Sequence, residues 1–367
     1  MKLKLVLSLA ICTFLSSCIK NEALNMEADI VSINVPETII NGQPVINNDN
    51  IVVYVKEGVK LDSIDFDFEI TPGATVSPSP KTRQNFNKSV VYTVKSEDGR
   101  FEKKYRVSFL KYLVPLSFDF ENFEIEKTDK FVDFFELIGG VRQNLWASGN
   151  RIYAISISGS KAPDAYPTSY TEDAQSGKYA LALETKSTGF FGQLLKKPIA
   201  AGNMFIGSFD VENGVIKPLE ATHFGLPFNQ VPVKLTGYFK YTPGKQMTNS
   251  DNKPIEGEDE GDIYAVLFNK AEVMANNPKV SWLDGRNVFT DPSIVAIARI
   301  ASAKRTPGTT FARFEAPFEF KKPLVKGEVD ANVYSLVIVA SSSKEGDLFK
   351  GAVGSRMIVD NLKIEVK

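Results

Sequence analysis

The sequence is nearly free of cysteine and histidine. Its 367 residues include two cysteines, Cys12 and Cys18, and a single histidine, His223. Nucleophilic catalysis by a hydroxyl or thiol usually needs a histidine base, and a zinc site needs several His or Cys ligands. We therefore expect neither a zinc centre nor thiol catalysis, and we expect His223 to have a structural role at a strand end.

Long apolar runs and a strong charge excess are also missing. The apolar run at residues 5–15 follows Lys2 and Lys4 and is far shorter than the roughly 20 residues of a membrane-spanning helix. A short apolar run behind a positive start is typical of a secretory signal. The formal net charge of −1 and the isoelectric point near 6.1 give no sign of nucleic-acid binding.

The signal segment ends at a cysteine. The residues Leu15-Ser16-Ser17-Cys18 resemble the lipobox of bacterial lipoproteins, which implies cleavage after residue 17 and a lipidated Cys18. The acyl chains would then be the only membrane anchor, and an acylated thiol forms no disulfide. The alternative is an ordinary signal followed by an incidental cysteine. We expect a signal peptide over residues 1–17 and a lipidated tether over 18–27.

Residues 28–112 have the pattern of several short strands. In "IDFDFEI", residues 64–70, apolar and acidic residues alternate strictly, which predicts a half-buried strand. Asp98-Gly99 lies between two strand-like runs and predicts a tight hairpin turn. A segment of this length with such strands predicts a small immunoglobulin-like sandwich. It has no cluster of polar side chains suited to a site, so we expect it to act as a spacer.

Residues 113–367 also read as strands, including "YALALET", "VKLTGYFKY", "DIYAVLF", "YSLVIVASS" and "RMIVDNLKIEV". The best short helix is at 269–277, and the acid-rich segment 248–262 is expected to be a solvated loop. Many strands with Gly- and Pro-rich turns predict a larger, decorated jelly-roll β-sandwich. The predicted fold class is therefore all-β in both modules.

Several of these segments carry a family resemblance. "LWASGN", "SGKYALALET", "KLTGYFKYTPG" and "SKEGDLFKGAVGSRMIVDNLKI" look like the putative carbohydrate metabolism domain (PCMD) of Bacteroidota lipoproteins, over about residues 113–367. The preceding "YTVKSEDGRFEKKYRVSF" is similar to immunoglobulin-like domains found in front of it. The resemblance implies a fold like that of jelly-roll carbohydrate-binding modules and a role with glycans.

One acid interrupts the apolar face of the last strand. Asp360 is in phase with Ile358 and Leu362, and a buried carboxylate needs a cation, hydrogen-bond donors or a proton. In jelly-roll carbohydrate-binding modules a similar Phe-Glu and Val-Asp-Asn meet at a structural calcium, and Glu121 and Asp360 match those positions. The resemblance implies calcium here. The alternative is that Asp360 accepts backbone N–H groups or pairs with a lysine.

Aromatic side chains in loop-like segments are candidates for sugar contact, because sugars stack on aromatic rings and hydrogen-bond to amides and charged groups. The alternative is that the aromatic residues pack in the core. The predicted glycan-binding residues are Trp146, Asn150, Tyr166, Trp282, Asp284 and Arg286.

These observations predict a lipoprotein of the outer membrane, on its cell-surface or periplasmic face, that binds an oligo- or polysaccharide. Other envelope proteins of glycan uptake are the expected partners. A glycoside hydrolase using two carboxylates about 5–10 Å apart is an alternative that the sequence leaves open. A structural or adhesive envelope protein is another.

Overall fold

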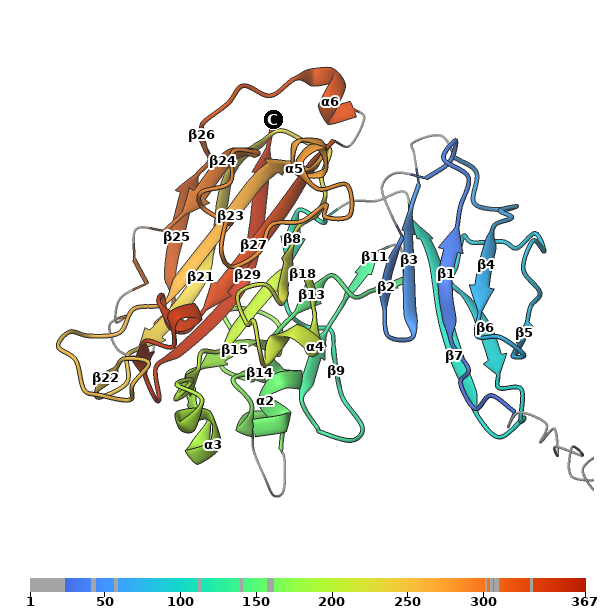
Figure 1. Ribbon diagram of the computed structural model, residues 1–367. Coiled ribbons are helices and arrows are strands. Elements are labelled where there is room, and N and C mark those ends of the chain that lie inside the picture. The colour runs from blue at the N-terminus through green and yellow to red at the C-terminus, as the bar shows by residue number, and fades with distance from the viewer. Residues whose placement is uncertain are drawn as a thin grey trace, which may run out of the picture. The chain divides into compact units, whose positions relative to one another are not determined.

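The computed structural model describes residues 24–40, 44–55, 59–110, 114–138, 141–156, 162–300, 302–303, 306, 310–330 and 333–367. The predicted signal peptide, residues 1–17, and the predicted lipidation site Cys18 lie outside these described residues. The chain divides into two compact units, one within residues 1–109 and one that is mainly residues 110–367 (Figure 1). Both units are built of strands, so the predicted all-β class is confirmed.

The first unit consists of two antiparallel sheets. One has the order β2-β3-β7-β6-β5, and the other pairs β1 with β4. Gly99, at φ +71°, lies in the turn between β6 and β7, as its place in the hairpin predicted. The strands are β1 (Ile30–Asn34), β2 (Val45–Asn47), β3 (Asn50–Tyr54), β4 (Asp67–Ile70), β5 (Thr75–Ser77), β6 (Val90–Lys95) and β7 (Glu102–Leu110).

Aromatic rings fill the space between these two sheets. Phe68 of β4 packs edge-on against Tyr92 of β6 with ring centroids 5.1 Å apart, and Phe66 lies 5.2 Å from Phe109 of β7. All four side chains are at most 5% exposed. The alternation read from residues 64–70 therefore identifies one face of this core.

The second unit is a sandwich of two large antiparallel sheets. One follows β14-β15-β29-β21-β25 with β8 added, and the other follows β13-β18-β27-β23-β24-β26 with β19 and β20 added. The strands of the first sheet are β8 (Ser117–Phe118), β14 (Thr168–Thr171), β15 (Ala180–Glu184), β21 (Pro232–Thr242), β25 (Ala312–Pro317) and β29 (Arg356–Val366). The strands of the second are β13 (Trp146–Ala147), β18 (Asn203–Phe209), β19 (Thr222–Phe224), β20 (Leu226–Pro227), β23 (Asp262–Asn269), β24 (Ile294–Arg299), β26 (Glu319–Phe320) and β27 (Tyr334–Ser341).

Smaller elements decorate this sandwich. The helix predicted near 269–277 is α5, and the side chain of Asn269 caps it by accepting N–H bonds from Ala271 and Glu272. Among the described residues, none of the helices is both long and apolar enough to span a membrane. The short pairs are β9 (Phe123–Ile125), β10 (Val132–Phe134), β11 (Glu136–Ile138), β12 (Val141–Gln143), β16 (Lys186–Ser187), β17 (Ile199–Ala200), β22 (Met247–Thr248) and β28 (Gly351–Ala352). The helices are α2 (Asn150–Ser156), α3 (Gly189–Leu194), α4 (Val211–Gly214), α5 (Lys270–Asn276), α6 (Lys326–Asp330), and the 3-10 turns η2 (Pro163–Ala165) and η3 (Gly346–Leu348).

Strand β23 is buried along its whole length and therefore has two covered faces. A Cβ at Gly261 would lie 2.0 Å from Met357 of β29, so residues in phase with Gly261 face the six-stranded sheet. The opposite phase, which includes Tyr264, faces away from that sheet, and part of it joins an outer cluster with Leu283 and Val288. The eight-stranded sheet thus packs on both sides.

The acid-rich segment is less solvated than expected. It connects β22 to β23, but its residue Asp259 is only 3% exposed. The Asp259 carboxylate accepts hydrogen bonds from the hydroxyls of Ser343 and Ser355 and from the backbone N–H of Ala352. This acid therefore anchors the loop that follows β27.

Candidate functional site

Trp146 lies in the core of the second unit. Its side chain is 8% exposed, and its indole N–H donates to Oε1 of Glu136 at 2.8 Å. The rings of Phe118 and Phe120 pack against it, at centroid distances of 4.9 and 5.7 Å. This corrects the prediction that Trp146 stacks on a sugar, because a ring enclosed in this way offers no face to a ligand.

Asn150 and Tyr166 are buried as well, each 1% exposed. The Asn150 side chain donates to the backbone oxygen of Thr168 and accepts from its N–H, which ties α2 to β14. The Tyr166 hydroxyl donates to the backbone oxygen of Asp129. Both are structural contacts, and this corrects their placement among the sugar-binding residues.

Trp282 is different, because it is only partly buried and stacks on His223 with ring centroids 4.1 Å apart. Burial lowers the pKa of His223, against the nearby charges of Asp210 and Asp284. Asp284 is 6% exposed and binds the guanidinium of Arg286, which also pairs with Glu220 at 3.0 Å. These three predicted residues share one loop with Gly285, which lines a cavity described below.

Glu121 and Asp360 hold the loop between β14 and β15. Oε1 of Glu121 accepts the N–H groups of Lys178 and Tyr179, while Oδ2 of Asp360 accepts those of Gln175 and Ser176. Burial raises the pKa of Asp360, the backbone donors oppose this, and the charge of Glu121 adds to it. The two carboxylates therefore lie near each other, as their match to the family motif implied.

These contacts correspond to the alternative in which Asp360 accepts backbone N–H groups. Calcium takes six to eight oxygen ligands, and the described residues contain no group of three or more His, Cys, Asp or Glu side chains placed to hold a metal ion. The residues present thus do not supply a full set of acidic ligands. Calcium binding at Glu121 and Asp360 stays a prediction.

A cavity of about 350 Å³ lies on the face of the eight-stranded sheet that points away from the six-stranded sheet. Strand register aligns two rows of side chains along its floor. The polar row is Asn203, Ser341 and Asp262, from β18, β27 and β23. The second row is Phe205, Val339, Tyr264 and Arg299, from β18, β27, β23 and β24.

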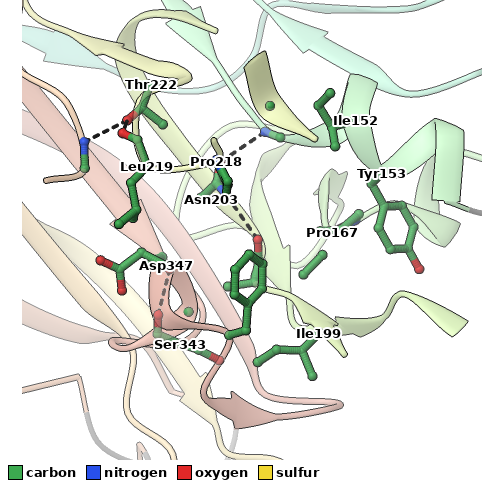
Figure 2. A pocket seen from close by; sticks show the side chains of 18 of the residues that line it. Ile152, Tyr153, Pro167, Ile199, Asn203, Pro218, Leu219, Thr222, Ser343 and Asp347 are labelled. Atoms are coloured by element: carbon green, nitrogen blue, oxygen red, sulfur yellow. Dashed lines mark hydrogen bonds between the residues drawn. The ribbon is translucent and has the colours of Figure 1, made fainter. Parts of the chain in front are cut away.

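The walls of the cavity come from short helices and loops. Figure 1 shows α2, α3 and α4 at one end of the second unit, and residues of all three helices line the cavity. Figure 2 shows Asp347 and Ser343 on one side and Ile152 and Tyr153 on the other. Thr222 holds the rim by accepting the N–H of Gly285 and donating to the backbone oxygen of Leu219.

Charged groups gather at the side near Asp347. Arg299 binds both oxygens of the buried Asp262, at 3.0 and 2.5 Å, and lies 4.3 Å over the ring of Phe289. Asp347 is exposed at the mouth, yet the surrounding protein desolvates it enough to raise its pKa, and the charges of Glu345 and Asp262 add to this effect. The cavity thus offers a fixed ion pair and a second carboxylate.

Sequence reasoning missed this cavity. Asn203, Ser341 and Asp262 are far apart in the chain and meet only through strand pairing. A local signal did exist at Asp262 and Arg299, because a single charge stands at the end of each of two otherwise apolar strands. A charged side chain at the end of an apolar strand indicates a buried ion pair or a ligand-binding site.

The fold and the cavity together define an all-β protein with a ligand-sized cleft on a jelly roll. Residues 119–365 match the family described as "Putative carbohydrate metabolism domain", and residues 30–108 match "SGBP, N-terminal". The first match covers more than half of the chain, so the chain belongs to the putative carbohydrate metabolism domain family. No curated protein matches the chain.

Two solved structures are similar over most of their length. One is described as a putative glycoside hydrolase from Bacteroides thetaiotaomicron, with 40% identity and a TM-score of 0.84, covering 95% of this chain and 99% of that one. The other is described as a putative glycoside hydrolase from Bacteroides vulgatus, with 34% identity and a TM-score of 0.62, covering 69% of this chain and 98% of that one.

Proposed function

We propose that this chain is an envelope lipoprotein whose second unit binds a glycan in the cleft of the eight-stranded sheet. The observation that carries the proposal is the polar lining of the cleft, where Asn203, Ser341 and the Asp262–Arg299 pair lie in a cavity that also contains the exposed Asp347. Sugar hydroxyls need such donors and acceptors, and the buried row of Phe205, Val339 and Tyr264 closes the floor beneath them. The family of the chain supports a carbohydrate as the ligand.

The polar contacts assigned to the glycan are on the charged side of the cleft. Asp347 has no ion pair among the described residues, and its carboxylate, which takes the backbone N–H groups of Asp347 and Leu348, has further lone pairs that can accept sugar hydroxyls. Arg299 is fixed by Asp262 and presents its remaining N–H groups from a rigid position. Trp282 and Arg286 flank the rim at Gly285 and are the predicted residues that we retain as outer contacts.

Lipidation at Cys18 would hold the protein at the outer membrane, with the first unit as a spacer. The match of residues 30–108 to "SGBP, N-terminal" supports an envelope location. In this arrangement the protein captures glycan for other envelope proteins of carbohydrate uptake. The motif at Leu15 to Cys18 supports the anchor.

A glycan array followed by calorimetry with the best ligand tests the proposal. Asp347→Asn keeps the shape of the side chain but removes its charge, and hydrogen bonds to charged groups contribute about 1.5–3 kcal/mol. We therefore expect at least about tenfold weaker binding. Glu319→Gln, an exposed acid on β26, is the matched control and should bind as the wild type does.

Two results would contradict the proposal. If no glycan binds the wild-type protein, the glycan-binding function fails. If a glycan binds equally well to Asp347→Asn and to a Tyr264→Ala variant that still melts cooperatively, binding takes place elsewhere on the molecule.

A glycoside hydrolase is the second candidate, and a specific observation favours it. Asp262 and Asp347 share the cleft, and the raised pKa of Asp347 suits a general acid. Against it, Asp262 is bound at both oxygens by Arg299, which leaves it poorly placed to activate water. Release of reducing sugar by the wild type, and its loss in Asp347→Asn, would establish the enzyme.

A further inference from the structure

One wall of the cleft is apolar and open to solvent, apart from Lys197, whose ammonium group donates to the backbone oxygen of Val215. Ile155, Phe191, Leu195 and Val215 all line the cavity, and yet these side chains are 68, 67, 46 and 40% exposed. They come from α2, from α3 and the residue after it, and from the residue after α4. An apolar wall that stays wet in the free protein indicates an interaction surface.

The apolar surface continues beyond the cavity. Phe190 and Leu194 of α3 are 81 and 68% exposed, and Ile216, after α4, is 79% exposed. The apolar C–H faces of a sugar ring are small and its edge carries hydroxyls, so a bare oligosaccharide would leave most of this surface in water. The charged side of the cleft, in contrast, suits hydroxyl groups.

The cavity therefore has a polar side and an apolar side. Asp347 and Ser343 lie across from Ile152 and Tyr153 in Figure 2, and Ile199 and Pro167 extend the apolar part. A single ligand that satisfies both sides has a polar head of sugar size with an apolar group attached to it.

We infer that the ligand is a glycan that carries an apolar substituent next to the sugar, such as an acyl ester, an aryl ester or a lipid aglycone. This inference rests on the proposed glycan-binding function. The sugar occupies the side of Asp347 and the Asp262–Arg299 pair. The substituent lies along Ile155, Phe191, Leu195 and Val215, and its burial removes their exposed area from water.

Matched pairs of simple glycosides test the inference. Calorimetry with methyl and octyl β-glycosides of glucose and of galactose, below their critical micelle concentrations, measures what the chain adds. Each buried methylene should strengthen binding about fourfold, so the octyl compound should bind on the order of a hundredfold more tightly than the methyl compound if three or four methylenes are buried. Octanol alone should bind far more weakly than the octyl glycoside.

Two variants locate the apolar group. Phe191→Ser and Leu195→Ser alter exposed side chains and should fold normally, but they should reduce the ratio of octyl to methyl affinity several-fold. Phe101→Ser, at a residue that is 52% exposed in the first unit, is the matched control and should leave the ratio unchanged.

The outcomes separate the inference from the proposed function. If octyl and methyl glycosides bind equally, the inference is overturned while the glycan-binding function stands. If octanol binds as tightly as the octyl glycoside, the cleft holds a lipid, and the proposed function fails with the inference. If Phe191→Ser abolishes sedimentation with phosphatidylcholine vesicles, or dimerisation, without changing the affinity ratio, the wall contacts a membrane or a second copy and the inference is wrong.

Discussion

Glu136 illustrates how much one buried carboxyl depends on its surroundings. It is 8% exposed and accepts the indole N–H of Trp146. Burial raises its pKa from an ordinary 4.5 to about 7, the hydrogen bond from Trp146 opposes this, and the charge of Asp119 adds to it. The folded protein therefore favours the neutral acid.

This pKa predicts a pH-dependent stability. Because the folded pKa is raised, the contribution of Glu136 is fully present below about pH 4.5 and is lost as the pH rises to about 7. The loss is on the order of 3 kcal/mol. Glu136→Gln keeps an oxygen for Trp146 and cannot ionise, so it should be more stable than the wild type at pH 8 and gain little at pH 5.

Urea unfolding at the two pH values measures the difference. Both tryptophans, Trp146 and Trp282, belong to the second unit, so their fluorescence follows the unfolding of that unit. Glu172→Gln, at an exposed residue of the same unit, is the control and is measured at the same two pH values. An equal effect of Glu136→Gln at both pH values would contradict the assignment.

Asp360 carries a second prediction at the residue scale. It accepts three backbone N–H groups, from Gln175, Ser176 and Asn361. Asp360→Asn turns an amide N–H₂ toward some of these donors, and an unsatisfied buried donor costs about 1–3 kcal/mol. We expect a lower melting temperature both in chelator and in millimolar calcium.

The same thermal melts, in chelator and in millimolar calcium, test whether calcium binds at Glu121 and Asp360. A wild-type melting temperature that rises with calcium, and a rise that disappears in both Glu121→Gln and Asp360→Asn, would establish the metal. Coincident wild-type melts would leave the carboxylates as acceptors for the backbone alone. Elemental analysis of the untreated protein provides an independent check.

At the scale of elements, the loop after β27 depends on Asp259. Removing this carboxylate in Asp259→Ala leaves the buried backbone N–H of Ala352 without an acceptor and takes one partner from the hydroxyls of Ser343 and Ser355, of which Ser343 still contacts the hydroxyl of Thr185. The expected loss of unfolding free energy is about 2 kcal/mol or more. Because Ser343 and Asp347 belong to this loop, ligand affinity should fall as well. Glu256→Ala, at an exposed residue of the same acidic segment, should change neither, and an equal loss there would refute the anchoring role.

The elements themselves were largely predictable, since β4, α5 and β29 follow from alternation, a capping Asn and an apolar phase. The site was not. Trp146 and Tyr166 look like loop residues, but their burial is decided by rings and acceptors elsewhere in the chain. The floor of the cleft depends on register between strands that no local pattern specifies.

At the scale of the whole molecule, the remaining prediction is that lipidation of Cys18 anchors the protein to a membrane. Cys18 follows a short apolar segment and two serines, and three acyl chains give stable membrane attachment. Wild-type protein should partition into the detergent phase of a membrane extract. Cys18→Ala should move to the aqueous phase or retain its signal peptide, and unchanged partitioning would exclude lipidation.

The pairing of β18 with β27 also determines when the cleft comes into being. Asn203 is joined to Ser341, and β27 must also align with β23, so the floor requires strands that lie far apart in the sequence of the second unit. Contacts between residues distant in sequence form late, because the intervening chain must close first. The first unit precedes these strands in the chain and can be complete while the second still lacks its floor. Ligand recognition is therefore acquired only once almost the entire chain is available, and a chain truncated before β27 would keep the first unit but lose the floor of the cleft.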